Sequence, residues 1–549
     1  YTPTTETMSL EEYYEISTSN NEAVIILNNE INEARATTKN GKVYLSYSFV
    51  HEYINSRFYY DSNENLLIYT TADSLVTVQN DSNECTIAKD TVTKDYTIMF
   101  VDTDDAYIAL DFVAEYSNML YSIFSAPDRI VIYNEFGTYT SVSAKKDTVI
   151  RYRGGIKSPI LEEVLADDSF VVLEEEENWT KVMSESGVIG YIQKTYLNEE
   201  TELERVSTYE EAEHEHILMD EKVNLVWHQV ERVSDNDRIA SILSETKGIN
   251  VISPTWFALD DNEGNISNVG SASYVTYCHQ NNIKVWGLLS NLKNDSVDTT
   301  EVLTHTSTRT NLVNQVIAAA IQLDLDGINV DFESLKVEVA DGYIQFIREL
   351  SLKCANNNLV LSVDNYVPSE YTEFYNRGEQ AVFADYIIVM AYDEHYVGSD
   401  EGPVASISFV KNGIADTLAE GVPAEQMILG IPFYTRVWIE TPKETSGDDV
   451  ESASDDYVSY ELDSQAVGMK AAAEFAANSG TEMTWLDDTG TYYVEYEEDG
   501  LTYKAWIEDV TSISLKLEEM KNNSLAGAAF WKLGLEDSAV WDTVVKYMN

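Results

Sequence analysis

The pattern of hydrophobic and polar positions is most regular in the C-terminal part of the chain, from Val223 onward. There, short apolar runs typical of buried strands alternate with segments that have a helical period. Such alternation predicts a parallel sheet, and eight runs in roughly 330 residues is the number expected for a closed (β/α)8 barrel. The eight runs are VNLVWHQ, GINVISPTW, IKVWGLLS, DGINVDFE, NLVLSVD, YIIVMAYDEH, MILGIPFY and GAAFWKLG.

The predicted barrel domain, residues 222–549, contains an insertion after its seventh strand. Between about 437 and 509 the pattern changes to a helix-like run, SQAVGMKAAAEFAA, followed by a hairpin-like run, TGTYYVEYEEDGLTYKAWIED. We predict a small α+β insertion here. Segments that follow barrel strands on this side form the walls of a substrate groove.

Two stretches near the N-terminus match each other without gaps. VYLSYSFVHEYIN, which begins at Val43, aligns with AYIALDFVAEYSN, which begins at Ala106, and each leads into a strand-like run that ends in tyrosine. The repeat predicts a duplicated small α+β module, with copies at 23–79 and 80–144 after an acidic N-terminal segment at 1–22. The strand, helix, strand pattern resembles copper-amine-oxidase N-terminal-like modules, which implies a scaffold without a copper site.

The pattern between 145 and 199 changes to short β-type runs separated by polar turns, such as TVIRYR and SFVVLEE. The segment ENWTKVMSESGVIGYI resembles a bacterial SH3-type barrel, which implies either a module that binds cell-wall peptides or a structural spacer. Residues 200–221 follow as an acidic run without glycine, which indicates a linker or an exposed helix. His214 and His216 lie in this run, but two neighbouring histidines alone do not predict a metal site.

Composition limits the classes of function. The 549 residues, 44% of them hydrophobic, indicate a globular chain of several domains. The net charge of −60 argues against nucleic acid or anionic lipid as a partner, because both would be repelled. No apolar stretch has the length of a membrane-spanning helix. The three cysteines, Cys85, Cys278 and Cys354, lack the spacing of a disulfide framework or a zinc site.

The chain begins at Tyr1 rather than at methionine, which we interpret as the mark of a processed or trimmed product. The sparing use of cysteine fits a bacterial cell surface as well as a cytoplasm. We expect a secreted or cell-surface protein of a bacterium, of the Gram-positive type, that is a monomer and uses no cofactor and no metal.

A row of polar groups marks the fourth predicted strand, within LDLDGINVDFESL. In a strand, Asn329, Asp331 and Glu333 share one face, whereas the apolar residues between them share the other. In an ordinary sheet the polar row would face solvent, but in a barrel the inward strand ends form the mouth of an active site. Glu333 comes last in the row, and repulsion from Asp331 would keep a proton on one carboxylate near neutral pH. Glu333 is therefore the candidate general acid.

With MAYDEH on the sixth strand and FWKLG on the eighth, this segment resembles the signature of glycoside hydrolase family 18, which includes chitinases and related β-N-acetylglucosaminidases. The resemblance covers about 220 to 549. It implies that the substrate's own 2-acetamido oxygen attacks the anomeric carbon to give an oxazolinium ion, with retention of configuration. The roles that it implies are an acetamido N–H acceptor for Asp331, a donor to the acetamido oxygen for Tyr392, walls of the same subsite for Met390 and Asp393, and an apolar floor under the sugar for Trp531.

One position departs from the family pattern. The family commonly has D-x-x-D-x-D-x-E, whereas this chain has Asn329 at the second position. An amide cannot share a proton with Asp331, although it can hydrogen-bond to that residue, so the resting charge and the pH profile of the site are open. Asp326, the first residue of the motif, is expected to have a supporting, hydrogen-bonding role.

Five further residues are candidate contacts of the substrate. Tyr434 and Arg436 lie at the end of the seventh strand, where packing is the alternative role. Trp227 and Trp256, on the first two strands, could line subsites or fill the top of the barrel. Trp506, in the insertion, is a candidate sugar contact.

These patterns lead to one main hypothesis and two kinds of alternative. We expect a retaining glycosidase that cleaves β-1,4 bonds after N-acetylglucosamine, and the N-terminal modules favour cell-wall peptidoglycan as the glycan. Cleavage of chitin, or of the chitobiose core of N-glycans, would need the same 2-acetamido group. A carbohydrate-binding protein without activity on the same barrel is the alternative from another class; such proteins usually lose the acid, whereas Glu333 is present.

Overall fold

The computed structural model describes residues 2–103, 105–443 and 460–548. Two compact units make up the chain, Tyr1–Glu213 and His214–Asn549. Among the described residues, no helix is long and apolar enough to cross a membrane.

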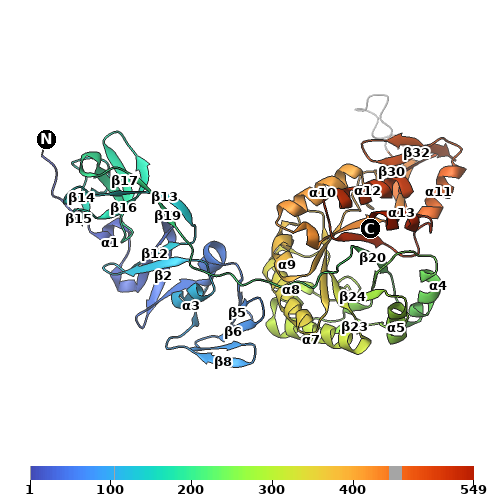
Figure 1. The fold of residues 1–549 in the computed structure, drawn as a ribbon, viewed down its shortest axis with the longest axis horizontal. Coiled ribbons are helices and arrows are strands. Elements are labelled where there is room, and N and C mark those ends of the chain that lie inside the picture. The colour runs from blue at the N-terminus through green and yellow to red at the C-terminus, as the bar shows by residue number, and fades with distance from the viewer. Residues whose placement is uncertain (1, 104, 444–459, 549) are drawn as a thin grey trace. The chain divides into compact units, whose positions relative to one another are not determined.

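The C-terminal unit is a closed parallel barrel, as predicted. Its strands follow the order β21-β20-β34-β28-β27-β26-β25-β24, and a further pairing of β21 with β24 closes the ring. Each predicted run forms a strand, and the helices surround the strands (Figure 1). The barrel strands are β20 (Val223–His228), β21 (Val251–Pro254), β24 (Lys284–Ser290), β25 (Gly327–Asp331), β26 (Val360–Tyr366), β27 (Tyr386–Met390), β28 (Met427–Pro432) and β34 (Gly527–Trp531).

Helices follow most of these strands, and a short hairpin follows β21. The helices are α4 (Ile239–Leu243), α5 (Ala272–Gln280), α6 (Thr299–Thr304), α7 (Thr306–Leu323), α8 (Ala340–Ala355), α9 (Arg377–Phe383), α10 (Ile407–Ala419), α12 (Val510–Asn522) and α13 (Val540–Met548), and the hairpin is β22 (Phe257–Leu259) with β23 (Ile266–Asn268).

The two faces of each barrel strand pack into different cores. Ile328 and Val330 of β25 belong to the large cluster between strands and helices. Trp227 and Trp286 belong to a smaller cluster inside the barrel. Because side chains alternate along a strand, the polar residues between Ile328 and Phe332 must face the interior.

The insertion forms a five-stranded antiparallel sheet with one helix, in the strand order β30-β29-β33-β32-β31. The hairpin-like run forms β32 and β33, as predicted. The helix-like run differs, because its first residues, Ser464–Gly468, continue β30 and the helix begins at Met469. Residues 444–459 of the predicted insertion lie outside the described residues. The elements are β29 (Tyr434–Pro442), β30 (Tyr460–Gly468), α11 (Met469–Asn478), β31 (Thr484–Leu486), β32 (Thr491–Glu498) and β33 (Leu501–Ile507).

In the N-terminal unit, the two predicted copies of the repeat share one sheet. Its strand order is β11-β12-β1-β2-β3-β10-β9, and the strands that open the two repeats, β3 and β10, pair with each other. The copies are therefore interleaved, because the hydrophobic period cannot tell which strands will pair. The elements are β1 (Glu22–Leu27), β2 (Glu30–Lys39), β3 (Lys42–Ser46), α2 (Tyr47–Phe49), β9 (Met99–Asp102), β10 (Asp105–Ala109), α3 (Leu110–Glu115), β11 (Leu120–Phe124) and β12 (Arg129–Tyr133).

A second sheet crosses the predicted boundary between the copies at 79/80. Its order is β4-β5-β6-β7-β8, and β6 pairs with β7 across that boundary. Residues on both sides of 79/80 thus belong to one folded unit. The strands are β4 (Phe58–Asp61), β5 (Leu66–Thr70), β6 (Leu75–Gln79), β7 (Glu84–Ile87) and β8 (Asp90–Thr93).

A third sheet occupies the predicted SH3-like region, with the order β15-β14-β18-β17-β16-β13-β19 and antiparallel pairings throughout. The SH3-like assignment stays a prediction. The outer strand β19 comes from the predicted acidic linker, which is therefore not an exposed helix at its start. The elements are α1 (Leu10–Tyr13), whose neighbours Tyr14 and Ile16 pack into this core, β13 (Gly137–Ser143), β14 (Thr148–Arg151), β15 (Ile160–Val164), β16 (Ser169–Glu175), β17 (Trp179–Met183), β18 (Ile189–Gln193) and β19 (Thr201–Arg205).

Candidate active site

A cavity of about 200 Å³ opens at the carboxyl ends of the barrel strands. Polar and aromatic side chains from five of the eight strands, or from the residues directly after them, converge on it. This is the place where parallel barrels carry their active sites. The lining residues are Trp227, Asp331, Glu333, Asp364, Tyr366, Met390, Tyr392, Asp393 and Trp531.

The backbone at the end of β25 aims two carboxylates into this cavity. Asp331 and Glu333 line the cavity, and Phe332 between them points to the outer core, where its ring stacks on Phe346 of α8 at 5.4 Å. The buried aromatic residue fixes the register of the strand end, because a slip of one residue would exchange the two faces. The predicted row of inward polar groups is therefore present.

Asp331 is the more enclosed of the two carboxylates. Its Oδ1 atom is buried and has no hydrogen-bond partner among the described residues. Burial raises the pKa of Asp331 well above its usual range, and the neighbouring charge of Glu333 raises it further. A buried acceptor without a donor is costly to an ionised carboxylate, so the empty enzyme favours a protonated form of this group.

Two hydrogen bonds to its backbone groups hold Glu333 at the mouth of the cavity. The side-chain amide of Asn291, after β24, accepts from the Glu333 N–H at 2.9 Å and donates to the Glu333 carbonyl at 2.9 Å. Burial raises the pKa of the Glu333 carboxyl, a hydrogen bond from Tyr366 opposes this rise, and the charge of Asp393 adds to it. Glu333 therefore keeps its proton to a higher pH than an exposed glutamate does.

Asn329 lies below this pair, fully buried, with every hydrogen-bonding position of its amide used. Its oxygen accepts from Trp227 Nε1 at 3.0 Å and from Ser253 Oγ at 3.0 Å. Its nitrogen donates to Ser362 Oγ at 3.0 Å and to Asp364 Oδ1 at 2.8 Å. Indole nitrogen can only donate, so the amide oxygen must face Trp227 and the amide nitrogen must face Asp364.

Asp364 and Tyr366, on β26, line the cavity but were absent from the predicted site. A signal was present for Asp364, because Ser362 and Asp364 alternate with the apolar Leu361 and Val363 in the fifth predicted strand, as the polar row of β25 does. Asp364 is buried, and burial together with the charge of Asp331 raises its pKa well above the usual range, while the hydrogen bond from Asn329 opposes this.

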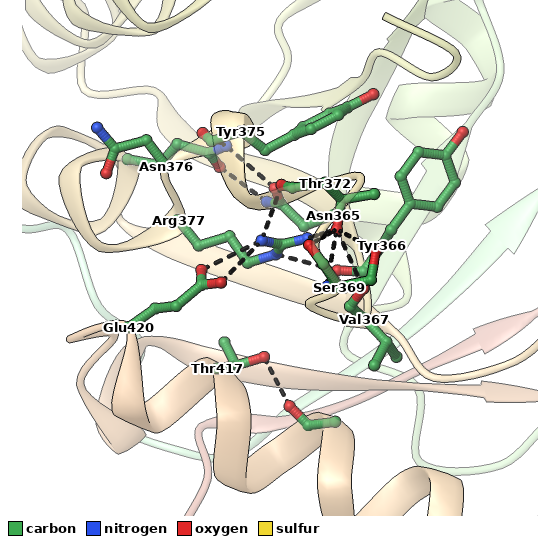
Figure 2. A network of polar contacts seen from close by, with 12 residues as sticks. Asn365, Tyr366, Val367, Ser369, Thr372, Tyr375, Asn376, Arg377, Thr417 and Glu420 are labelled. Carbon is green, nitrogen blue, oxygen red and sulfur yellow. Dashed lines mark hydrogen bonds and ion pairs between the residues drawn. The ribbon is translucent and has the colours of Figure 1, made fainter. Parts of the chain in front are cut away.

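A buried arginine fixes the loop that follows β26. Arg377, at the start of α9, donates to the Tyr366 carbonyl at 3.0 Å, to Thr372 Oγ1 at 2.8 Å and to the Glu420 carboxylate at 3.1 Å (Figure 2). The same loop carries Tyr375, whose hydroxyl donates to the Phe332 carbonyl at 3.2 Å. The network thus holds tyrosine side chains against the backbone on either side of Glu333.

The segment after β27 supplies a further wall of the cavity. Tyr392 packs beside Tyr434 with ring centroids 6.4 Å apart, and the Tyr434 hydroxyl donates to Asp393. Asp393 adopts a left-handed backbone with φ of 55°, which turns the chain at the cavity edge. Trp227 and Trp531 lie together, with centroids 5.9 Å apart. The structure therefore places Tyr392, Met390, Asp393, Trp531 and Trp227 on one cavity with Asp331 and Glu333.

Six predicted site residues lie outside the lining of this cavity. Two of them, Asn329 and Tyr434, contact residues that line it, and the other four lie elsewhere in the barrel domain. Asp326 precedes β25, at the other end of the barrel, where it accepts from Val285 N–H and contacts His279, each at 2.8 Å. Its hydrogen-bonding role is therefore to join β24 and β25 rather than to support the carboxylates. The indole of Trp256 donates to Asn236 at 2.8 Å in the outer core, because the residue points outward from its strand.

The other two residues belong to the insertion sheet. Arg436, on β29, donates to Ser464 Oγ at 3.2 Å. Trp506, on β33, packs on Tyr493 with ring centroids 4.8 Å apart. No described residue of this sheet is among the lining residues of the cavity. Tyr434 contacts the site through its hydrogen bond to Asp393 and its packing beside Tyr392.

The arrangement combines a proton donor with a second, enclosed carboxylate and aromatic walls. Glu333 can protonate a leaving oxygen, and Asp331 can balance positive charge that develops beside it. The faces of Trp227 and Trp531 suit the C–H face of a sugar ring. Among the described residues, no group of three histidine, cysteine, aspartate or glutamate side chains is placed to hold a metal ion.

Comparison with family models gives two matches. Residues 230–536 match the model described as glycosyl hydrolases family 18, which is more than half of the chain. Residues 20–123 match the model described as copper amine oxidase N-terminal domain.

Known proteins resemble part of the chain. YdhD of Bacillus subtilis (strain 168), named as a sporulation-specific glycosylase, is 27% identical over 285 residues, which are 50% of this chain and 63% of that protein. The cortical fragment-lytic enzyme of Bacillus anthracis is 21% identical over 268 residues, 47% of this chain and 59% of that protein. The chain thus spans about three fifths of the length of these two relatives. A chitinase structure from Chromobacterium violaceum ATCC 12472, with 21% identity and a TM-score of 0.51 over 59% of this chain and 98% of that chain, shares the fold.

Proposed function

Because this chain belongs to glycosyl hydrolase family 18 and is a glycoside hydrolase, we propose that it cleaves β-1,4 bonds after N-acetylglucosamine with retention, using the substrate's 2-acetamido group. The observation that carries this proposal is the pair of Asp331 and Glu333 in one enclosed cavity, with the pKa of each carboxyl raised. One of the two can then be an acid near neutral pH while the other is available as an anion.

In the proposed mechanism Glu333 is the general acid. It gives its proton to the oxygen of the leaving sugar as the bond to the anomeric carbon breaks, and the acetamido oxygen forms a new bond to that carbon. Asp331 accepts from the acetamido N–H, so that its charge balances the oxazolinium ion, and the Tyr392 hydroxyl donates to the acetamido oxygen. Glu333, now a carboxylate, takes a proton from water, whose oxygen attacks the anomeric carbon while the bond from that carbon to the acetamido oxygen breaks; this restores the acid and the free acetamido group.

We propose peptidoglycan as the glycan and the cell surface or the exterior as the site of action. The relatives named for sporulation and for cortical fragments favour a cell-wall substrate. Chitin is the second candidate, because the chitinase structure has the same fold. Endo cleavage of N-glycans and binding without cleavage are the remaining alternatives.

The test is mass spectrometry of the soluble products after incubation with purified peptidoglycan and, separately, with chitooligosaccharides. The full chain is compared with its Glu333→Gln variant, whose amide keeps the shape of the carboxyl but has no proton to give. We expect fragments with a reducing N-acetylglucosamine end from peptidoglycan, and only with the unchanged chain.

Three other results would each reject part of the proposal. Products from chitooligosaccharides alone would replace peptidoglycan with chitin. Equal products from Glu333→Gln would reject Glu333 as the acid. No product from either glycan would favour binding without cleavage or an N-glycan substrate.

A further inference from the structure

We propose that Asp364 is the proton-sharing partner of Asp331 in this chain, a positioning role that the family pattern gives to an aspartate where this chain has Asn329. This inference rests on the proposed function, because it concerns the charge that Asp331 presents to the substrate. It begins from two features, a buried Asp331 oxygen without a donor among the described residues and a buried carboxylate on the next strand.

Strand register brings the two carboxylates side by side. In the parallel pair of β25 and β26, Asn329 is opposite Ser362 and Val330 is opposite Val363. Asp331 and Asp364 are the next residues on the two strands, and neighbouring strands lie about 4.8 Å apart. Both residues line the same cavity, so both side chains point inward.

The groups that face Asp364 supply no basic charge. Asp331 lies on β25 and Glu333 just after it, Tyr366 lies on the same strand as Asp364, Tyr392 and Asp393 follow β27, and Tyr343 lies on α8. Among the described residues that line the cavity, none is lysine or arginine. Two buried carboxylates on adjacent strands are costly to ionise together, so in this proposal they share one proton. The raised pKa of Asp364 agrees with this.

Asn329 fits this arrangement, whereas an ionised aspartate at 329 would not. The amide nitrogen donates to Asp364 Oδ1 at 2.8 Å, and the amide oxygen is fixed by Trp227 and Ser253. An ionised carboxylate at 329 would have no hydrogen to give to Asp364 and would repel it. Asparagine at 329 and aspartate at 364 therefore form a matched pair: the shared proton has moved from the same strand to the adjacent strand.

The consequence for catalysis is a place for the proton when Asp331 ionises. As positive charge develops on the acetamido group, the proton shared by the two aspartates stays on an Asp364 oxygen, and Asp331 meets the oxazolinium N–H as an anion. The net charge of the pair does not change, so no additional charge is buried. Glu333 keeps its separate proton for the leaving oxygen.

The experiment measures kcat/KM and kcat against pH for Asp364→Asn, with the substrate on which the unchanged chain is active. Asparagine at 364 can still accept from Asn329, so the packing is kept while the carboxylate is lost. Without the Asp364 proton to stabilise its anion, Asp331 ionises at higher pH, and we expect the acid limb to move up by about one pH unit, with kcat at neutral pH reduced about tenfold.

The double variant Asn329→Asp/Asp364→Asn exchanges the amide and the carboxylate. It should return the acid limb toward that of the unchanged chain, because a carboxylate is again beside Asp331 and the amide at 364 can donate to it. Asp385→Asn is the matched control: Asp385 is also buried, with a pKa raised to about 6, but it precedes β27 at the other end of the barrel and accepts from Leu361 N–H. That control should leave the pH profile in place.

The outcomes separate this inference from the proposed function. Activity that requires Glu333, together with an Asp364→Asn profile whose limbs do not move, would overturn the inference and keep the function, even if kcat fell. If the unchanged chain cleaves no substrate, infrared difference spectra between the unchanged chain and Asp364→Asn still test it. A protonated carboxyl band at neutral pH that both Asp364→Asn and Asp331→Asn remove supports the shared proton, and its absence from the unchanged chain rejects it.

Discussion

Buried carboxylates in this barrel occur in two settings with opposite electrostatics. In the layer of helices, each of three buried arginines holds a glutamate: Arg309 of α7 binds Glu349 of α8 at 2.7 Å, Arg348 of α8 binds Glu379 of α9 at 2.8 Å, and Arg377 of α9 binds Glu420 at the end of α10 at 3.1 Å. In the cavity, acidic groups face one another without such partners among its lining residues.

The difference separates the tasks of the two regions. A buried charge that has an ion-pair partner is tolerated, and here each pair links one helix to the next. If one partner is removed, the other remains as an uncompensated buried charge, which lowers the free energy of unfolding. Burial without a basic partner raises the pKa of a carboxyl group, so the group keeps a proton that it can donate. Burial of such a group also lowers the free energy of unfolding. The predictions below test each side of this contrast.

The largest expected effect is on turnover, from Glu333→Gln. Loss of the only proton that can reach the leaving oxygen should lower kcat by about 10³-fold, with the affinity for a sugar oligomer kept. The matched control is Glu338→Gln, an exposed glutamate five residues later, which should leave kcat unchanged. A steady-state assay and a binding titration measure both quantities. If the two variants had equal kcat, Glu333 would not be the general acid, and the carboxylates of the cavity would have no catalytic role that distinguishes them from those of the helix layer.

The next effect is on stability, from Arg309→Met. Arg309 is fully buried, and its loss leaves the Glu349 carboxylate buried without its ion pair, which should lower the free energy of unfolding by about 3 kcal/mol. The double variant Arg309→Met/Glu349→Leu should recover much of this, because no lone charge remains. Chemical denaturation of the C-terminal unit within the full chain is the measurement. A single variant as stable as the unchanged chain would show that this pair only fills space.

The cavity should respond in the opposite sense. The pKa of Asp364 is raised in the folded chain, so above its unfolded value of about 3.9 the unfolded state binds fewer protons and the free energy of unfolding falls as pH rises. Asp364→Asn removes this loss and should stabilise the fold at neutral pH by about 1–2 kcal/mol. The gain should vanish below about pH 4, where aspartate is protonated in both states. Destabilisation at neutral pH would contradict the raised pKa of the buried Asp364 carboxyl.

The sequence allowed us to predict which strands form the barrel and which face of the fourth strand points inward. It did not allow us to predict which residues of neighbouring strands lie side by side. Short apolar runs located each barrel strand, and period-two alternation in the fourth run put Asp331 and Glu333 on the inner face. Asp364 was missed although it has the same alternation, since only the register of β25 with β26 brings it beside Asp331. The same limit explains the interleaved repeats of the N-terminal unit, whose strands pair across the predicted boundary.

Tryptophan roles were harder to predict for a different reason. Trp227 and Trp256 are both almost fully buried and both end up near the carboxyl ends of strands, yet Trp227 lines the cavity and Trp256 lies in the outer core. A large aromatic residue is favoured on either face, so its identity does not tell the faces apart. Asp326 illustrates the same point for a motif residue: it belongs to the pattern, but it lies before the strand begins.

The smallest expected effect is a shift of the basic limb of the pH profile in Tyr366→Phe. The Tyr366 hydroxyl lowers the pKa of Glu333 by hydrogen bonding to its charged form, so its removal should raise that pKa. Activity needs Glu333 protonated and is lost as pH rises through this pKa, so the basic limb should move up, by about half a pH unit. Tyr396→Phe, in an exposed loop position after β27, is the control. A limb that moved down, or did not move, would show that burial and Asp393 alone set the proton affinity of Glu333, and that the arginine network which holds the Tyr366 loop serves stability rather than the acid.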